Sequence, residues 1–530
     1  MRIPAFLLLI FFGLQGLSQS LTSGGKLKPE QAIIKKKKYT ISLDLDLQKQ
    51  TIDGYTSIDL LTSRSTSVLL FDLMDSFQVR TVMVNGKQQN FNYAHKLIRI
   101  ELDNDLPPGK QTVKINYGGH PHTAIRPPWD DGFTWTKDPA GNPWIAVTAE
   151  GGGGKLYYPC KDHPSDEPDL GAELIITVPK GLVVAGPGLL QKKTARKNKV
   201  TYEWKTSYPI NNYSILFNVG KFNVVSRDYT SINGNRIPMQ FYVLEANTSK
   251  AEHHLDILTQ TVKSREKYFG EYPWAKEKIA ICETPHLGME HQSMNAYGNK
   301  FRYDKVGGQD FDWLMDHEFG HEWWGNKITA KDWGDYWIHE GINTFGDMLD
   351  VRELAGEAEY IRRFKEMAPG FENKTPIVQG KDIDEETAYV GDIYGKGAFF
   401  MHTLRYVIGD SIFFPALRSF ATDQAYTYSN MTSTEDIEQF FSKKAGKDLV
   451  PLFNLFLRST NKLEIEVRRK GAPDNYEIRL LNIDMDLPVE IETDKGRSVV
   501  TLSKKPIKLS STRLPLVDLD KYYITRIIYE

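Results

Sequence analysis

The hydrophobic pattern of this 530-residue chain changes twice, and that change limits its possible folds more than any other feature. Apolar and polar residues alternate over strand lengths between about 39 and 235, as in YTISLDLDL at 39–47. From about 250 the apolar residues follow helical spacing, and the alternation returns from 463 to the end. A chain this long is expected to form about two to four domains. The sequence therefore predicts a multidomain α+β protein.

The three patterns predict an N-terminal β domain at 39–245, an α-rich domain at 246–460 and a small C-terminal β domain at 461–530. In the middle part, a helical pattern beginning near 250 ends at Gly270. Further helix candidates lie at 310–328, 338–355, 357–368, 394–408 and 434–445.

The first 18 residues have the layout of a secretory signal peptide, with Arg2, an apolar run and then small residues. Cleavage after Ser18 would leave Gln19 first, followed by a linker at 19–38. We expect an exported protein, periplasmic or extracellular, with no transmembrane segment in the mature chain. The basic run at 35–38 precedes a strand, and we interpret it as a solvated strand entrance.

The overall charge does not favour nucleic acid as a partner, and the cysteine count leaves open whether a disulfide forms. The formal net charge is only −2, so nothing in the overall charge favours nucleic acid as a partner. Cys160 and Cys282 are the two cysteines. An exported protein permits one disulfide, but two buried thiols are an equally good interpretation.

The segment DHEFGHEWWG, at 316–325, carries the strongest chemical signal. His317 and His321 lie four residues apart, so on a helix their Cβ atoms are about 5–6 Å apart on one face and both imidazoles can reach one Zn²⁺. Glu318 points off that axis and can act on a metal-bound water. A third ligand is needed, and Glu340 supplies it from a second predicted helix. Its neighbour His339 is the lesser alternative.

These motifs resemble the gluzincin metallopeptidases, and HEWWGNKIT…DWGDYWIHEG resembles the aminopeptidase N and leukotriene hydrolase family in particular. The resemblance covers roughly residues 40–530 and is densest between 268 and 400. It implies an N-terminal β domain, a thermolysin-like catalytic domain and a C-terminal β-sandwich, with one Zn²⁺ per chain.

The same resemblance implies how substrate binds. The family has a Gly-x-Met-Glu-Asn segment whose Glu binds the free α-amino group of a peptide. Here Gly288, Met289 and Glu290 keep that order, while Leu287 and His291 depart from it. The resemblance implies that Glu290 binds the amine and that Gly288 and Met289 contact the substrate.

A second carboxylate is implied by PCKDHPS at 159–165, which resembles the end of a β-domain segment that reaches the family's active site. Counting back from Asp162 places Glu150 where the family also binds the amine. The glycines at 151–154 are similar to part of a phosphate-binding loop, but Ala149 and Leu156 do not fit that motif. We expect these glycines to allow close backbone packing.

Tyr394 in YGKGA resembles the family tyrosine that hydrogen-bonds the tetrahedral oxyanion, a role suited to a neutral phenol. Tyr389, five residues earlier, is the competitor, and we interpret it as an aromatic residue packed before a helix.

Together these residues predict a zinc aminopeptidase acting on peptides with a free N-terminus. An endopeptidase of thermolysin type, an epoxide hydrolase of the same family and a non-catalytic peptide-binding protein are the alternatives. The sequence ends after a short β segment without the large helical domain that supplies substrate-binding basic residues in the epoxide hydrolases, so that activity is not expected.

Overall fold

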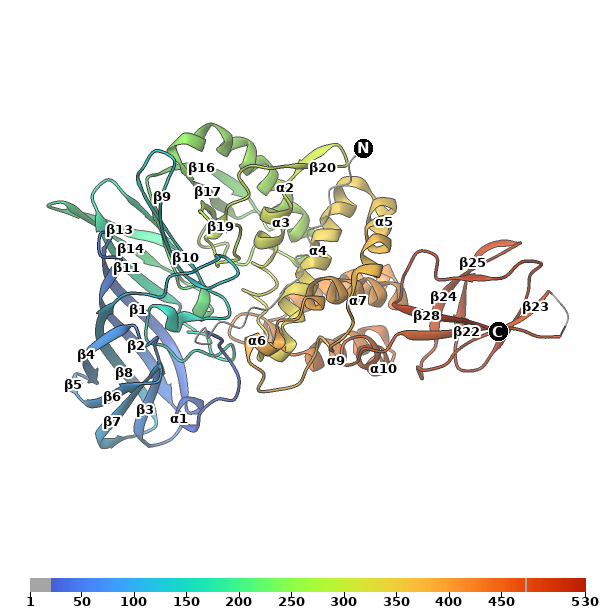
Figure 1. The fold of residues 1–530 in the computed structure, drawn as a ribbon, viewed down its shortest axis with the longest axis horizontal. Coiled ribbons are helices and arrows are strands. Elements are labelled where there is room, and N and C mark those ends of the chain that lie inside the picture. The colour runs from blue at the N-terminus through green and yellow to red at the C-terminus, as the bar shows by residue number, and fades with distance from the viewer. Residues whose placement is uncertain (1–20, 472–473) are drawn as a thin grey trace.

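The structure is a computed structural model that describes residues 21–471 and 474–530. Figure 1 shows three parts in chain order: a β-rich N-terminal part, a helical middle part and a C-terminal β part that extends from the helices at one end. The predicted signal peptide at 1–18 lies outside the described residues. The three-part α+β architecture predicted from the hydrophobic pattern is confirmed.

The N-terminal part is built on an eight-stranded sheet. Its strands lie in the order β13 (Leu189–Arg196), β14 (Lys199–Lys205), β11 (Ala172–Pro179), β1 (Ile34–Asp46), β2 (Thr51–Thr62), β8 (Gly109–Gly119), β4 (Phe77–Val84) and β5 (Lys87–Gln88). Neighbours are antiparallel except β1 and β11. In β1, alternate side chains such as Ile41, Leu43 and Leu45 are buried, as the period of two requires.

Two smaller sheets complete this part. One has the order β12 (Val183–Ala185), β15 (Asn218–Gly220), β10 (Pro143–Thr148) and β9 (Gly132–Lys137); the other has β3 (Thr66–Asp72), β7 (Leu97–Leu106) and β6 (Asn90–Ala94). A short helix, α1 (Pro29–Ala32), precedes β1. Strand β10 ends two residues before Glu150, so this sheet carries that side chain to the helical part.

The helical part contains a four-stranded sheet in the order β16 (Phe222–Thr230), β17 (Arg236–Leu244), β18 (Ile279–Glu283) and β19 (Asn295–Tyr297). The parallel pairing of β17 with β18 joins residues upstream of the predicted boundary at 246 to this unit. Alternation alone could not show which sheet these strands enter. A hairpin, β20 (Asp304–Val306) and β21 (Gln309–Phe311), follows.

Helices make up the rest of the middle part (Figure 1). They are α2 (Ala251–Phe269), α3 (Trp313–Gly320), α4 (Trp337–Ala355), α5 (Glu357–Met367), α6 (Glu385–Ala388), α7 (Asp392–Ile408), α8 (Asp410–Thr422), α9 (Thr434–Ala445) and α10 (Val450–Phe456). The sequence did not predict α8, which contains Pro415, a residue that disfavours helix interiors.

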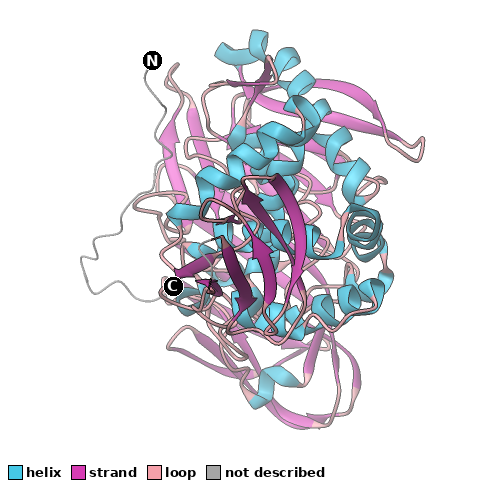
Figure 2. Ribbon diagram, turned by 90° about the vertical axis from the view of Figure 1, so that its right-hand side faces the viewer, coloured by secondary structure: helices cyan, strands magenta, loops and turns pink. Residues whose placement is uncertain are grey.

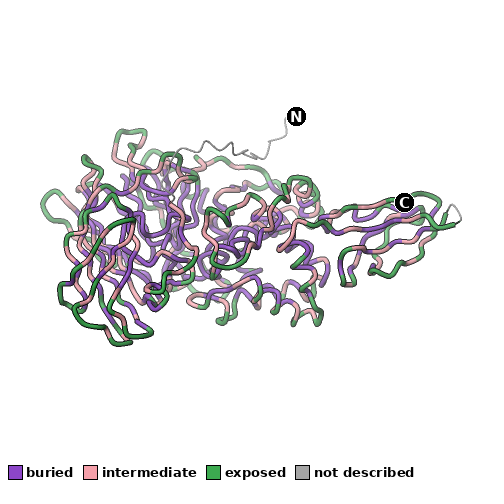
Figure 3. Tube along the Cα trace, turned by 60° about the horizontal axis from the view of Figure 1, so that its bottom comes forward, coloured by how far each residue is buried: buried purple, intermediate pink, exposed green. Residues whose placement is uncertain are grey.

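The C-terminal strands form two sheets, which Figure 2 shows in front of the helices. The first has the order β26 (Ile507–Ser510), β23 (Asn475–Leu480), β22 (Leu463–Arg469) and β28 (Thr525–Tyr529), and the second has β25 (Gly496–Leu502), β24 (Leu487–Thr493) and β27 (Leu516–Val517). Buried residues occur in all three parts of the chain (Figure 3). One continuous apolar cluster extends from Ile33 to Ile524.

Two sequence expectations for helix and strand ends were wrong. The helix expected at 310–328 ends at Gly320, and the chain then turns so that Trp323 and Trp324 are buried on separate partners. Strand β1 begins at Ile34, so the basic run lies inside it.

Lys36 in that run is fully buried, and the interpretation of a solvated entrance is wrong for it. Its ammonium donates to the Asn212 side-chain oxygen at 2.7 Å and to the Lys161 carbonyl at 3.0 Å. Asp166 lies 4.0 Å away and also pairs with Lys161 at 2.8 Å. Tertiary partners that are distant in sequence therefore determine the burial of this lysine.

Neither cysteine is bonded: Cys160 and Cys282 are separate buried thiols. Within residues 21–471 and 474–530, no helix has the length and apolar content needed to cross a membrane.

We predict that Lys36→Ala destabilises the protein by roughly 3 kcal/mol, because it leaves buried polar partners unpaired. Lys35→Ala is the matched control, since its side chain is 56% exposed and its ion pair with Asp169 is at the surface. Thermal or urea unfolding of both variants measures the difference. Equal stabilities for the two variants would contradict the buried role of Lys36.

Candidate active site

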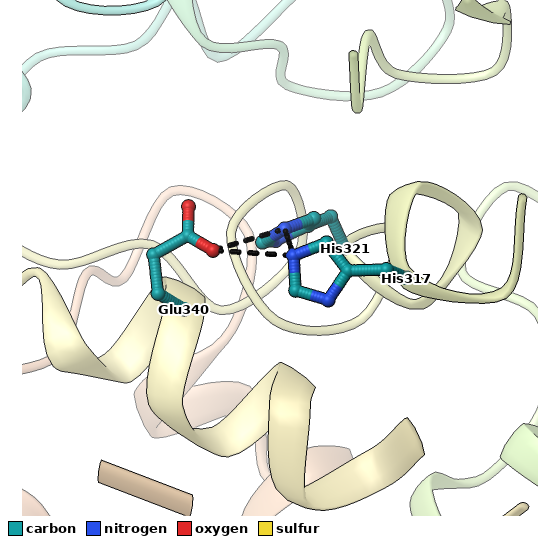
Figure 4. Close-up of side chains that lie close together, drawn as sticks. All are labelled: His317, His321 and Glu340. Atoms are coloured by element: carbon teal, nitrogen blue, oxygen red, sulfur yellow. Dashed lines mark hydrogen bonds and ion pairs between the residues drawn. The ribbon is translucent and has the colours of Figure 1, made fainter. Parts of the chain in front are cut away.

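Two helices bring the predicted metal ligands together. His317 lies in the last turn of α3, His321 caps that helix, and Glu340 lies in the first turn of α4. The Nε2 atoms of the two histidines are 3.2 Å apart, and Oε2 of Glu340 is 3.3 Å from His317 and 3.5 Å from His321. Figure 4 shows the three side chains pointing at one another. Although α3 ends early, its last turn preserves the spacing that the motif predicted.

The hydrogen bonds of the outer ring nitrogens orient both histidines. Nδ1 of His317 lies 2.9 Å from a carboxylate oxygen of Asp347, and Nδ1 of His321 lies 2.8 Å from the carbonyl of Trp324. Both partners are acceptors, so each Nδ1 carries the proton and donates. The two Nε2 lone pairs and Oε2 of Glu340 then converge as three acceptors without a donor between them. This donor set fits a single Zn²⁺.

The electrostatics also favour a cation at this point. Burial would lower the pKa of His317, but the carboxylates of Asp347 and Glu340 raise it well above its usual value. Burial would raise the pKa of Glu340, but His321 and His317 hold it well below its usual value. The cluster therefore requires positive charge, which protons or a metal ion can supply.

His339 does not belong to this cluster. Its Nε2 accepts a hydrogen bond from the backbone N–H of Ala330 at 2.9 Å, and burial lowers its pKa to about 3. On α4 it points away from Glu340, as the helical rotation of about 100° per residue requires. Its role in the structure is to fix the loop before α4.

Glu318 lies directly against the backbone of Gly288. A Cβ added to Gly288 would be 2.4 Å from Cγ of Glu318 and 2.6 Å from its Oε1, so only glycine fits there without displacing the carboxylate. Burial raises the pKa of Glu318 to about 8. A cation held by the adjacent histidines would lower that pKa, because its charge favours the ionised carboxylate.

The amine-binding candidates come from two domains and meet near the metal ligands. Glu290 is 4% exposed, and Glu150 is half-buried near the start of the loop after β10. Burial raises the pKa of Glu150 well above its usual value, and the negative charges of Glu290 and Glu340 raise it further. This mutual effect on the pKa requires the carboxylates to lie near one another. Met289, 6% exposed, holds the segment by accepting a backbone hydrogen bond from Ala296 at 2.9 Å.

His291, the departure from the resembled motif, connects the two segments that carry the amine-binding candidates. Its Nε2 lies 3.2 Å from the carbonyl oxygen of Ala149, the residue before Glu150. Burial lowers the pKa of His291 to about 3, so the ring is neutral and donates this hydrogen bond. The carbonyl of Glu290 itself accepts from Asn326 at 2.7 Å.

Tyr394 projects from the first turn of α7 towards the metal ligands. Its ring centroid is 6.0 Å from that of His317, and its hydroxyl is hydrogen-bonded to the hydroxyl of Tyr389. Tyr389 packs on Tyr336, as expected of an aromatic residue before a helix. Its hydroxyl contact with Tyr394, however, gives it a place in the site that the sequence interpretation did not include.

Residues 253–456 match the Peptidase family M1 domain, and this segment contains every metal-ligand candidate. This part of the chain is thus similar to the peptidase family M1 domain. The resemblance to the aminopeptidase N and leukotriene hydrolase family is therefore confirmed.

Curated relatives agree with this assignment. The chain is 24% identical to a leucyl aminopeptidase of Saccharolobus solfataricus over 79% of this chain and 53% of the relative. It is 22% identical to aminopeptidase M1-D of Oryza sativa subsp. japonica over 82% of this chain and 51% of the relative. The chain thus spans about half the length of the curated relatives it matches.

Solved structures support the fold over more of the chain. An M1 zinc metallopeptidase from Deinococcus radiodurans, solved with a Tyr-Ser-Ala substrate, superposes with a TM-score of 0.68 at 20% identity. The match covers 83% of this chain and 97% of that chain. At this identity the likeness establishes the fold alone: a β domain, the helical M1 domain and a C-terminal β domain.

Three residues that support the M1 site were not found from the sequence. Asp347 orients His317, and Arg265 holds Asp347 through an ion pair of 2.5 Å. Asp131 accepts from the backbone N–H of Glu150 at 3.0 Å and so fixes the loop that carries it. The sequence could have indicated Asp347, because it follows Glu340 by seven residues, which is about two helical turns along the same face of α4.

We predict that Asp347→Asn weakens zinc binding by about 10–100-fold, because the amide neither orients His317 in the same tautomer nor raises its basicity. Asp350→Asn is the matched control: Asp350 pairs with Arg265 at 2.7 Å in the same buried cluster but is not hydrogen-bonded to His317. Competition with a chromogenic chelator measures both affinities. If Asp350→Asn weakens zinc as much as Asp347→Asn does, the effect belongs to the cluster as a whole.

Proposed function

We propose that this protein is a zinc-dependent aminopeptidase, which hydrolyses the first peptide bond of a peptide with a free N-terminus. The observation that carries the proposal is one juxtaposition. The acceptors of His317, His321 and Glu340 converge on one point. The segment of Glu290 packs on Glu318 through Gly288, and its His291 is hydrogen-bonded to the residue before Glu150. A metal ion held by the three ligands and a substrate ammonium bound by Glu290 and Glu150 would leave the first peptide bond beside Glu318, which is what an exopeptidase requires.

In this mechanism His317, His321 and Glu340 would hold the zinc ion. Zinc bound there supplies Lewis acidity to a water molecule and to the peptide carbonyl. Glu318 accepts a proton from the attacking water and later delivers it to the leaving amine. Tyr394 donates a hydrogen bond from its neutral hydroxyl to the developing oxyanion.

Glu290 and Glu150 bind the substrate ammonium. Two buried carboxylates that repel each other are stabilised when a cation enters between them, so binding of the amine relieves a cost that the empty site carries. Because this interaction fixes the peptide terminus beside Glu318, it selects the first peptide bond for hydrolysis.

The names of the curated relatives support this reading, since they include a leucyl aminopeptidase and aminopeptidase M1-D. The alternatives make different demands on the site. An endopeptidase does not require carboxylates that bind the substrate ammonium, and a non-catalytic binding protein does not require Glu318 or Tyr394. Epoxide hydrolysis has no specific support among the described residues.

We predict that N-acetylation of a good peptide substrate lowers kcat/KM by about 100-fold or more, because two charge-assisted hydrogen bonds to the ammonium are lost. The same loss should accompany Glu290→Gln with the free peptide, while Glu318→Gln should abolish turnover and retain zinc. Equal cleavage of free and acetylated peptides would favour the endopeptidase alternative. A wild-type protein that binds no zinc and cleaves no peptide would refute the proposal.

We further predict that Gly288→Ala lowers kcat by about 100-fold, since the new Cβ displaces the Glu318 carboxylate and a shift of about 1 Å can cost that much. Zinc content should remain at one per chain, because the atoms nearest to the new Cβ all belong to Glu318. Gly370→Ala is the control, as its position has no heavy atom within 4 Å. Steady-state kinetics and metal analysis of both variants test this prediction. An unchanged kcat in Gly288→Ala would contradict the role of Gly288 in leaving room for the Glu318 carboxylate.

Export is part of the proposal and is supported by the pattern of residues 1–18 alone. Amino-terminal sequencing of the mature protein tests it, with Gln19 as the expected first residue.

A further inference from the structure

Residues 22–25, here called the N-terminal strap, lie along the segment that leads into α6. The backbone N–H of Gly25 donates to the carbonyl of Ile383 at 3.0 Å, and the N–H of Glu385 donates to the carbonyl of Ser23 at 3.1 Å. Gly24 forms a β-bridge with Asp384. The strap therefore adds a short antiparallel strand to this loop, and Ser23 is only 4% exposed.

The other side of the strap is bonded to the N-terminal β domain. The ammonium of Lys155 donates to the carbonyl of Thr22 at 2.8 Å, and Nε2 of His163 lies 3.0 Å from the carbonyl of Gly25. Lys155 is itself fixed by Asp162 at 2.6 Å. The strap thus joins residues of the β domain to the loop before α7, at the junction where α6 appears in Figure 1.

The strap fits tightly at one glycine. Gly24 has a φ of +83°, and a Cβ there would be 2.2 Å from Cδ1 of Trp333. The indole N–H of Trp333 donates to the hydroxyl of Ser23 at 3.0 Å. No residue with a side chain satisfies both the left-handed backbone and this contact. The indole lies just before α4, the helix that carries Glu340.

Both segments that the strap joins lead to residues of the proposed active site. The carboxylate of Glu385 packs on the backbone of Gly151, next to Glu150, where a Cβ would be 2.2 Å from it. On the other side, the N–H of Tyr389 donates to the carbonyl of Glu385 at 2.8 Å, and the Tyr389 hydroxyl bonds to Tyr394.

A cavity beside the strap shows the same connection. It has a volume of about 20 Å³ and is lined by both Ser23 and Glu150. This is room for about one water molecule, so little space separates the strap from the loop that carries Glu150.

We propose that the N-terminal strap is a positioning element of the active site: it holds Glu150 and Tyr394, which come from different domains, in register with the metal ligands. This role rests on the proposed aminopeptidase function. The strap lies only three residues beyond Gln19, the expected first residue of the mature chain. Catalytic geometry would then depend on the extreme N-terminus of the mature protein.

The first test is Gly24→Ala, in which the new Cβ clashes with Trp333 and displaces the strap. We expect kcat to fall about tenfold or more, because Tyr394 moves relative to the metal ligands. KM for a free-amine peptide should rise, because Glu150 moves. Gly86→Ala is the control for backbone strain, because Gly86 has a φ of +79° but no heavy atom within 4 Å. We expect kcat and KM of Gly86→Ala to stay within about twofold of the wild-type values, because Gly86 lies in the turn between β4 and β5 and not in the strap.

Rescue in trans separates positioning from folding. A chain that lacks residues 19–25 behind its leader should show the same loss as Gly24→Ala. The N-acetylated synthetic peptide QSLTSGGKLK, which lacks the free amine of a substrate, should restore kcat in a saturable way. The same peptide with alanine at position 24 should not. If the shortened chain and Gly24→Ala retain wild-type kcat and KM, the proposal is overturned.

Amide hydrogen exchange gives a readout that does not require activity. The amides of residues 383–389 should exchange faster in Gly24→Ala than in wild type, and at the wild-type rate in Gly86→Ala. Unchanged exchange overturns docking of the strap, whereas faster exchange with unchanged kinetics overturns its positioning role. If the wild type cleaves no peptide, the proposed function fails, and exchange still decides whether the strap docks.

Discussion

One buried arginine organises the helices on which the site is built. Arg265 of α2 is fully buried and forms ion pairs with Asp316 of α3 and with Asp347 and Asp350 of α4. Burial raises the pKa of Asp316 and Asp350, whereas His317 lowers that of Asp347 against the effect of burial, so Asp347 is the carboxylate that keeps its negative charge beside His317. Since a buried charge that loses its partner costs several kcal/mol, the three helices have one low-energy arrangement. The same contact that fixes the helices also orients a metal ligand.

Close backbone approach is the second constraint, and glycines make it possible. A Cβ on Gly341 of α4 would be 2.7 Å from Cα of Gly397 of α7, so these helices touch at their backbones. This contact lies one residue from Glu340 and three from Tyr394, and it sets the separation between metal ligand and phenol. Gly320 and Gly346 similarly leave room for the Arg265 guanidinium. Larger residues at these positions would move catalytic groups apart before they disturbed the core.

The sequence predicted the parts of this arrangement that depend on local spacing. The i, i+4 histidines and the three-part order of strands and helices follow from helical and strand periodicity. The end of α3, the burial of Lys36 and the orientation of His317 by Asp347 depend on partners 26 to 176 residues away, through contacts such as those to Asn343, Asn212 and Asp347. Periodicity contains no information on such partners. The assignments of Glu290, Glu150 and Tyr394 came from resemblance, and the geometry is consistent with the roles it implies.

Charge balance connects the metal, the substrate and the strap. Glu150, Glu290, Glu318 and Glu340 lie around two histidines, and burial disfavours so many ionised carboxylates unless cations are present. In the proposed mechanism, a divalent metal ion would compensate the charge at one end, and a substrate ammonium would compensate it at the other. The repulsion between Glu150 and Glu290 would otherwise push their two loops apart, because they come from different domains. A structural tie such as the N-terminal strap resists that separation, which allows the free enzyme to keep both carboxylates ready for an amine.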